Sequence, residues 1–412
     1  LKNTVLFLCS LVFYCWGEVR FFPVMLALIL INYLCGLGLE RFDRNRTARL
    51  VLLLIALAGS LGMLFYFKYA NFVLSSLNAL FGTSFAAIPG ISVLPLGISF
   101  YTFQSMGYLI DVYNGKYAPE KNPAKFALFV SFFPQLIQGP IARFDQLESQ
   151  LVTPHRFDLD GIERGLLLML WGWFKKKVIA DRALSLVEAV FGNQSAYGGA
   201  VIVVGVLFYS LQQYADFSGG IDLVTGIAQL FGIQLAPNFK RPYFSVSLGD
   251  FWRRWHITLG IWFRDYLYIP LGGSRKGKRR LLLSLFVVWT LTGLWHGAAW
   301  NFVLWGFVLF VFIALEKFCI GGFLERHRFL SRLYFLFLIP QTWVVFRISD
   351  LGELGDYFSR LYPFLSSGES VFAGDLLRQL KSYWWLFALG ILLATPWPRR
   401  FYEKYRATPL VW

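Results

Sequence analysis

Long runs of apolar residues are the feature that most restricts how this chain can fold. A transmembrane helix needs about 17 to 25 apolar residues to cross the hydrocarbon core of a bilayer. Only 15% of the 412 residues are charged, whereas a soluble domain needs roughly 25% to cover its surface. The sequence therefore predicts an all-α, multi-pass membrane protein. Its expected spans lie near residues 4–17, 21–39, 50–67, 91–110, 198–215, 281–296, 299–318, 329–347 and 383–396.

Other apolar pieces are too short, or too often interrupted by Pro, Gly or charge, to be simple spans. Irregular backbone at membrane depth is tolerated only where protein or water surrounds it. We therefore expect a ring of roughly nine to eleven transmembrane helices around re-entrant or interfacial helices, in a single membrane domain covering residues 1–412. The interrupted pieces are 71–82, 126–141, 163–179, 221–235 and 251–271.

The net charge of +15 is compatible with nucleic acid, an anionic membrane surface or an acidic substrate as the partner. Basic residues cluster between apolar runs, and short basic loops stay on the cytoplasmic side of a membrane. Membrane lipid therefore explains the charge, and no nucleic acid is expected. The clusters are 41–49, 175–182, 275–280 and 399–406.

The first apolar run lacks a small-residue cleavage site, so we interpret it as a span rather than a signal peptide. Because the chain starts with Leu1 rather than Met, we expect an upstream piece to be missing. The four cysteines, Cys9, Cys15, Cys35 and Cys319, lie in apolar stretches without metal-ligand spacing. We expect them to be small buried side chains, with no metal site or disulfide framework.

His296 lies in the apolar string LTGLWHGAAWNFVLWG. It follows Arg280 by sixteen residues, so a helix from the basic cluster would carry it roughly 24 Å inward. That is past the middle of a hydrocarbon core of about 30 Å. An ionisable group at this depth is a functional hypothesis by default, although a core histidine bonded to neighbouring carbonyls also fits. The small residues nearby favour a deep polar pocket.

His256 lies in FWRRWHITLGIWFRDYLYIPLGG, beside Arg253 and Arg254. Arginines and tryptophans anchor interfacial helices, but arginines also bind the phosphates of a coenzyme or carrier. If they bind donor phosphates, neutralising both should raise the donor KM more than it lowers kcat, whereas the reverse would indicate an anchor. Other candidates for donor binding or for lining the pocket are Gln138, Tyr214, Asp216, Trp295 and Asn301, although an aspartate can simply cap a helix. His155 and His327 lie in polar loops and receive no role.

The two histidine-containing strings closely resemble the membrane-bound O-acyltransferase (MBOAT) family, and more narrowly its alginate and peptidoglycan O-acetyltransferase branch. Further agreement comes from PLGISFYTFQSMGYLIDVY, FFPQLIQGPIARF, YADFSGGID and WVVFR, so the likeness covers about residues 95–347. Two features depart from the family pattern. Members usually have another hydrophobic segment before the FYCWGE-like motif at 13–18, and many carry an aromatic residue where Gly220 stands.

The resemblance implies that His296 is the catalytic histidine and that His256 is a second one nearer the cytoplasmic side. It also implies funnels from both faces of a bacterial inner membrane. The donor would be acetyl coenzyme A or an acyl carrier protein, no cofactor would be bound, and an extracytoplasmic acetyltransferase partner would complete transfer to an extracellular polysaccharide. His296 would act as general base on an acceptor hydroxyl, although a covalent acyl-histidine also fits.

Two other functions remain open from the sequence. Relatives that transfer D-alanine to teichoic acid share the architecture, although FRDYLYIPLGG looks more like the acetylating branch. A transporter or flippase would also use broken helices and buried polar groups. Transporters are often built from internal repeats, and no such repeat is apparent in this sequence.

Overall fold

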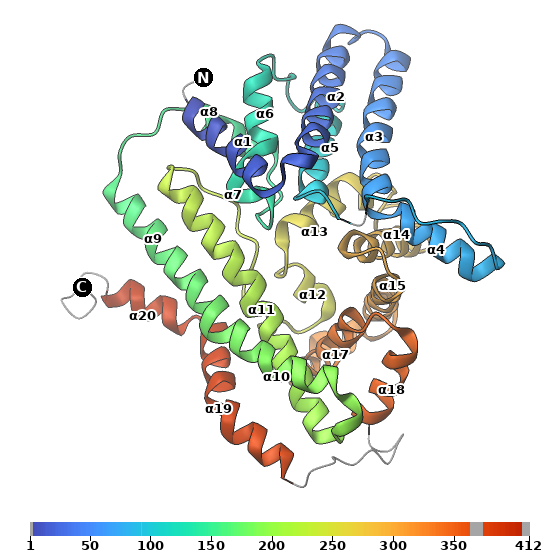
Figure 1. The fold of residues 1–412 in the computed structure, drawn as a ribbon, viewed down its shortest axis with the longest axis vertical. Helices are drawn as coiled ribbons and strands as arrows, with labels where there is room; N and C mark the ends of the chain where they lie inside the picture. The colour runs from blue at the N-terminus through green and yellow to red at the C-terminus, as the bar shows by residue number, and fades with distance from the viewer. Residues whose placement is uncertain (1–2, 92, 363–373, 406–412) are drawn as a thin grey trace.

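The computed structural model describes residues 3–91, 93–362 and 374–405, which form helices and no β-strand. The all-α prediction is confirmed. Figure 1 shows the helices in chain order. They are α1 (Thr4–Glu18), α2 (Phe22–Arg41), α3 (Arg46–Lys68), α4 (Ala70–Phe81), α5 (Ile98–Tyr113), α6 (Pro123–Ser131), α7 (Phe133–Leu136), α8 (Phe144–Val152), α9 (Leu159–Phe174), α10 (Asp181–Gly192), α11 (Gly199–Leu230), α12 (Leu248–Trp252), α13 (Ile257–Phe263), α14 (Lys278–His296), α15 (Trp300–Leu315), α16 (Gly321–Arg326), α17 (Arg328–Arg347), α18 (Leu351–Leu361), α19 (Asp375–Ala394) and α20 (Trp397–Tyr405).

Five helical stretches of the described chain are long and apolar enough to cross a membrane, so this is a multi-pass membrane protein. The predicted count of nine to eleven spans stays a prediction. Helices α14 and α19 have 19 and 20 residues, but both carry charged residues near their starts. The five stretches are Thr4–Arg41, Arg46–Lys68, Gly199–Leu230, Trp300–Arg326 and Arg328–Arg347.

Helix α11 corrects the division predicted for this part of the chain. The expected span at 198–215 and the interrupted piece at 221–235 form one helix of 32 residues that ends at Leu230. The glycines of α11 do not break it. A Cβ at Gly226 would crowd α9, and a Cβ on α9 at Gly172 would crowd the backbone of α11. Small residues of this kind let two membrane helices pack backbone to backbone.

The basic cluster at 175–182 is also corrected, because it is not a loop. Residues Lys175–Ala180 form a π-helical segment, η2, that joins α9 to α10 without a break. The Lys175 ammonium lies 2.6 Å from a carboxylate oxygen of Asp222, and that of Lys176 lies 2.9 Å from Asp216. Acidic side chains of α11 therefore neutralise these lysines. The last predicted cluster, 399–406, ends outside the described residues.

The cysteine prediction holds for one residue and is wrong for two. Cys35 is buried and Cys15 is half-buried, but Cys9 and Cys319 are exposed. The two exposed cysteines lie on stretches apolar enough to cross a membrane. A thiol behaves as a small hydrophobic group, so these positions can face lipid and do not need burial in protein.

Two hydrophobic cores divide the molecule, one built mainly from the first 150 residues and one from residues after 178. A third, smaller core joins them and includes Phe103, Trp262 and Trp295. In Figure 1, α12 and α13 lie near the centre of the view, between α11 on one side and α14 and α15 on the other. The piece at 251–271, predicted to be interrupted, is indeed a series of short helical segments. The fold thus brings irregular backbone to the middle of the protein.

Candidate active site

A cavity of about 1050 Å³ reaches both predicted histidines. One wall is a face of α14, because its lining residues there recur every three or four positions. These residues are Leu285, Val288, Trp289, Thr292 and His296, so the cavity follows α14 to its last residue. The opposite walls come from residues 246–264 and from the end of α15 with the segments after it. Helix α15 runs antiparallel to α14, because Gly293 lies against Phe302 and Gly306 against Trp289. The charged lining residues Glu316 and Lys317, which follow α15, therefore lie at the end of the cavity away from His296.

His296 is partly exposed and has aromatic walls. The rings of Trp295, Trp305 and Phe346 have their centroids 5.0, 5.2 and 5.2 Å from the imidazole centroid, each nearly perpendicular to it. Within the part of the chain that the structure describes, its ring nitrogens form no hydrogen bond to protein. The imidazole is therefore held by packing, and it borders a cavity from which a ligand could reach it.

The position of His296 depends on close contact between α14 and α15. A Cβ at Gly293 would overlap the carbonyl oxygen of Phe302, and a Cβ at Gly306 would overlap that of Trp289. Only glycine allows the two helices to meet at this distance.

His256 occupies an unusual backbone conformation. Its φ of 46° lies in the left-handed region, which costs energy for most residues other than glycine and is concentrated at functional sites. Its side chain is buried, with Nδ1 3.4 Å from Oδ1 of Asn238. That oxygen also accepts hydrogen bonds from the backbone N and Oγ1 of Thr258, at 3.0 and 2.9 Å. Nε2 of His256 is buried without a partner in the described chain, which leaves it available to a bound group.

Trp295 connects the two histidines. Its ring centroid lies 5.6 Å from that of His256 and 5.0 Å from that of His296. Trp295 is itself buried, in the small core that joins the two halves of the molecule. The two imidazoles, 40 residues apart in sequence, thus border one cavity and share one aromatic neighbour.

Two arginines line the charged end of the cavity, Arg253 and Arg264. The Arg253 side chain is 73% exposed, and its guanidinium lies 3.4 Å from Asp250. The neighbouring Arg254 is 33% exposed, pairs with the same carboxylate at 3.1 Å and is not among the lining residues described for the cavity. Of the two arginines predicted to bind the donor, Arg253 is thus the one placed at the cavity.

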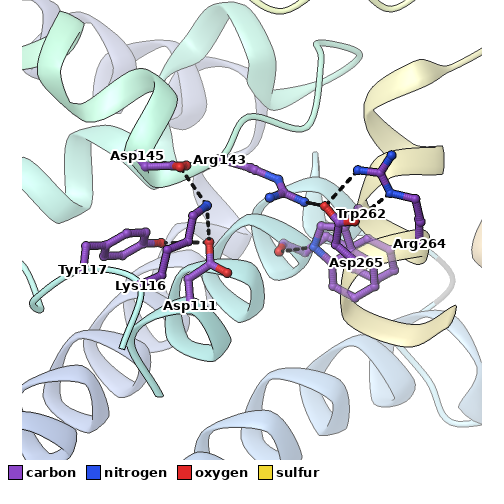
Figure 2. Close-up of polar contacts among 9 residues, drawn as sticks. Asp111, Lys116, Tyr117, Arg143, Asp145, Trp262, Arg264 and Asp265 are labelled. Carbon is purple, nitrogen blue, oxygen red and sulfur yellow. Dashed lines mark hydrogen bonds and ion pairs between the residues drawn. The ribbon is translucent and has the colours of Figure 1, made fainter. Parts of the chain in front are cut away.

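Arg264 is fixed by an ion-pair network. Figure 2 shows the Asp265 carboxylate between the guanidinium groups of Arg264 and Arg143. The Arg264 Nε lies 2.7 Å from Oδ1 of Asp265. Nearby, Nε1 of Trp262 donates to the carbonyl oxygen of Phe103 at 2.9 Å. Together these contacts hold the π-helical segment η5 (Arg264–Tyr268) at the end of the cavity.

A second ion-pair cluster lies beside this network in Figure 2. The Lys116 ammonium contacts Asp145 at 2.7 Å and Asp111 at 3.2 Å. Burial opposes the charged form, but the hydrogen bonds to Asp145 and Asp111 raise the pKa of Lys116 above its ordinary value. The cluster ties the loop after α5 to the start of α8, so it supports the N-terminal half around the site.

The remaining predicted site residues lie outside the lining of the described cavity. Asn301 donates from Nδ2 to the carbonyl oxygen of Phe346 at 3.0 Å and so joins α15 to α17. Tyr214 packs in an aromatic cluster with Trp255, and Asp216 pairs with Lys176. Gln138 fills the space next to Gly220, where a Cβ would lie 2.6 Å from its Oε1. The structure gives each of these side chains a packing or pairing contact.

Two ionisable residues near the site were missed from the sequence. Glu316 lines the cavity, and its carboxylate accepts backbone N–H groups of Leu248 and Gly249 at 2.6 and 3.0 Å, which caps the start of α12. Lys68 ends α3 and reaches the end of α14. The signal for both was present, because each is an ionisable residue within or at the end of an apolar run.

Membrane-spanning helices around a cavity that reaches the buried His256 and the partly exposed His296 define a polytopic membrane protein with an enzyme-like site. Residues 119–334 match the membrane-bound O-acyltransferase (MBOAT) family. The chain belongs to this family, and it is an O-acyltransferase. The resemblance inferred from the sequence is thereby confirmed.

Three relatives show how far the likeness extends. A Pseudomonas putida protein named "Probable alginate O-acetylase AlgI" is 38% identical over 368 residues, which cover 88% of this chain and 75% of the relative. A Helicobacter pylori peptidoglycan O-acetyltransferase is 34% identical over 84% of this chain and 71% of its own. A Bacillus subtilis teichoic acid D-alanyltransferase is 28% identical over 50% of this chain and 54% of its own.

Proposed function

We propose that this protein transfers an acetyl group from a cytoplasmic thioester to a hydroxyl outside a bacterial inner membrane, for O-acetylation of a polysaccharide. The observation that best supports this proposal is that one cavity extends from a group of charged side chains to His296. The similarity to relatives named as O-acetyltransferases spans 84–88% of this chain, whereas the D-alanyl-transferring relatives match 50% of it. These observations favour acetyl over D-alanyl.

The orientation follows from the basic clusters. Residues 275–280 precede α14, and residues 41–49 include the turn between α2 and α3, so both α3 and α14 would start at the cytoplasmic face. Their far ends meet, because the Tyr69 hydroxyl donates to the carbonyl oxygen of Leu294 at 2.7 Å. The charged end of the cavity would then face the cytoplasm and receive the donor. The acceptor would approach His296 from the outer side.

In this mechanism His296 acts as general base. It takes the proton of the acceptor hydroxyl while the hydroxyl oxygen attacks the thioester carbonyl carbon. The new C–O bond replaces the C–S bond, and the imidazolium returns the proton to the departing thiolate. The aromatic walls formed by Trp295, Trp305 and Phe346 would exclude water, which would otherwise hydrolyse the donor.

His256 would support this reaction through its unpartnered Nε2, as a donor-positioning group or proton relay. A covalent route, in which a histidine first accepts the acetyl group, uses the same residues. Rapid-quench single turnover with labelled donor and no acceptor separates the two routes. The covalent route predicts that the protein becomes labelled. General base catalysis predicts that the protein stays unlabelled but transfers the acetyl group normally once acceptor is added.

Donor binding predicts different effects for two neighbouring arginines. Arg253→Gln should raise the donor KM about three- to tenfold and change kcat less, because an exposed guanidinium at the cavity can bind donor phosphates by charge-assisted hydrogen bonds. Arg254→Gln is the matched control and should leave the donor KM near wild type. Initial rates against donor concentration measure both. A fall in kcat at unchanged KM for Arg253→Gln would indicate a structural anchor.

The function itself is tested with purified protein in liposomes that enclose the donor and have polysaccharide outside. The donor is acetyl coenzyme A or an acetylated acyl carrier protein, with the acetyl group labelled. We expect acetyl ester on the polymer only when an extracytoplasmic partner acetyltransferase is also supplied, because this partner is proposed to complete the transfer to the polysaccharide. Movement of intact donor or of a lipid-linked sugar, with no ester formed, would instead support a transporter. Use of a D-alanyl thioester in place of the acetyl donor would support D-alanyl transfer.

A further inference from the structure

Lys68 is placed to control the position of the proposed catalytic histidine. It is the last residue of α3, and its ammonium donates a hydrogen bond to the carbonyl oxygen of Trp295, the residue immediately before His296. It also donates to Oγ of Ser99 at 3.3 Å. We propose that Lys68 is a positioning residue for acyl transfer, which fixes the end of α14 and with it the His296 imidazole. This inference rests on the proposed role of His296.

The end of α14 depends on side chains from outside the helix. The last four carbonyl groups of a helix have no partner within it. Two consecutive carbonyls here are satisfied by consecutive residues of the α3–α4 junction, because Tyr69 donates to Leu294 and Lys68 donates to Trp295. The helix's own closing bond, from the N of Gly297 to the O of Gly293, is long at 3.4 Å. The external donors are therefore the stronger restraint on this terminus.

The charge of Lys68 suits this place. Within the described chain the Lys68 ammonium forms no ion pair with a carboxylate. Its partners are the partly negative end of α14 and the faces of the Trp295 and Tyr69 rings, whose centroids lie 5.8 and 5.7 Å from Nζ. An ionisable group in a membrane helix is costly, so it usually pairs with another polar group and marks a functional site. Here the ammonium is directed at the backbone beside His296.

A lysine at the end of a membrane helix often extends its ammonium to the headgroups, so a simple anchor is the competing explanation for Lys68. The contacts argue against it, because the ammonium is bonded to a backbone carbonyl and a serine hydroxyl from other helices. The lysine is thereby held at the end of α14, beside His296.

The test compares substitutions that remove or keep the cation. Lys68→Met should lower kcat for acetyl transfer by about ten- to a hundredfold, since small displacements of a catalytic group cost up to about 10²-fold. The donor KM should stay near wild type, because Lys68 lies outside the donor cavity. Lys68→Arg keeps the charge and the donors, and should recover kcat to within about fivefold of wild type. Lys121→Met, at an exposed lysine paired with Glu40, is the control and should be fully active.

Three results would overturn the proposal. They are a wild-type kcat for Lys68→Met, a loss that merely follows the amount of folded protein, and a folded Lys68→Arg that is as impaired as Lys68→Met. If Lys68→Met does not fold, Lys68→Gln replaces it, and full activity of that variant would equally overturn the proposal.

His296→Gln is measured in parallel. An active His296→Gln would refute the proposed function, whereas an inactive one beside a fully active Lys68→Met would refute only the positioning role.

Discussion

Replacing His296 by glutamine is expected to lower the rate of acetyl transfer by about 10²- to 10⁴-fold, the usual contribution of a positioned base. Glutamine can fill much of the space of the imidazole but cannot accept a proton near neutral pH. Because His296 borders a cavity and lies at a helix end, insertion and folding should survive. Initial rates in proteoliposomes at equal amounts of folded protein measure the effect.

His327→Gln is the matched control for this substitution. His327 is exposed, precedes α17 and lies outside the lining of the described cavity. Its replacement should leave both the transfer rate and the thermal stability unchanged. A His296→Gln protein that transfers acetyl groups at nearly the wild-type rate would remove His296 from the mechanism.

Gly306→Ala should also lower both activity and stability, although it adds only one methyl group. The new Cβ would overlap the carbonyl oxygen of Trp289 on α14, and a rigid backbone atom cannot move aside as a side chain can. Overpacking of this kind typically costs about 1–3 kcal/mol, more than the roughly 0.5–1 kcal/mol that alanine gains over glycine in a helix. We expect α14 and α15 to separate, with a lower melting temperature and at least about tenfold slower transfer.

Gly62→Ala provides the comparison for this substitution. Gly62 also lies inside a membrane helix, α3, but a Cβ there would meet nothing within 4 Å. This variant should be as stable as the wild type or slightly more so, and fully active. Melting temperatures in detergent and transfer rates in liposomes report on both variants. A Gly306→Ala protein that matches the wild type in both measurements would show that the close contact does not position His296.

Local sequence was enough to predict the class of fold and to single out the two histidines that border the cavity. Apolar runs of membrane-crossing length predicted helices, because the energy of burying backbone in lipid leaves few alternatives. The interrupted piece at 251–271 was expected to be irregular, and it carries His256 in a left-handed conformation. The place of His296 at the end of a helix followed by glycine was also readable from LTGLWHG.

Contacts between distant segments were not readable. Glycines in α11 looked like interruptions, but they allow close packing against α9. Whether a glycine breaks a helix or permits close packing depends on the neighbouring helix, which the local sequence does not show. Lysines at 175–182 looked like a cytoplasmic loop because their acidic partners lie on another helix. Asn301 and Tyr214 were chosen for polarity near the motifs, and they turn out to pack between helices. Lys68 was missed because its partner, Trp295, is 227 residues away.

The most direct test of the account is a cryo-electron microscopy structure with a non-transferable thioether analogue of the acetyl donor. The account predicts that the analogue occupies the cavity along α14, with its acyl group within about 3–4 Å of the His296 imidazole and its phosphates near Arg253. An analogue bound outside this cavity, or one whose acyl group lies at the charged end with His296 out of reach, would contradict it.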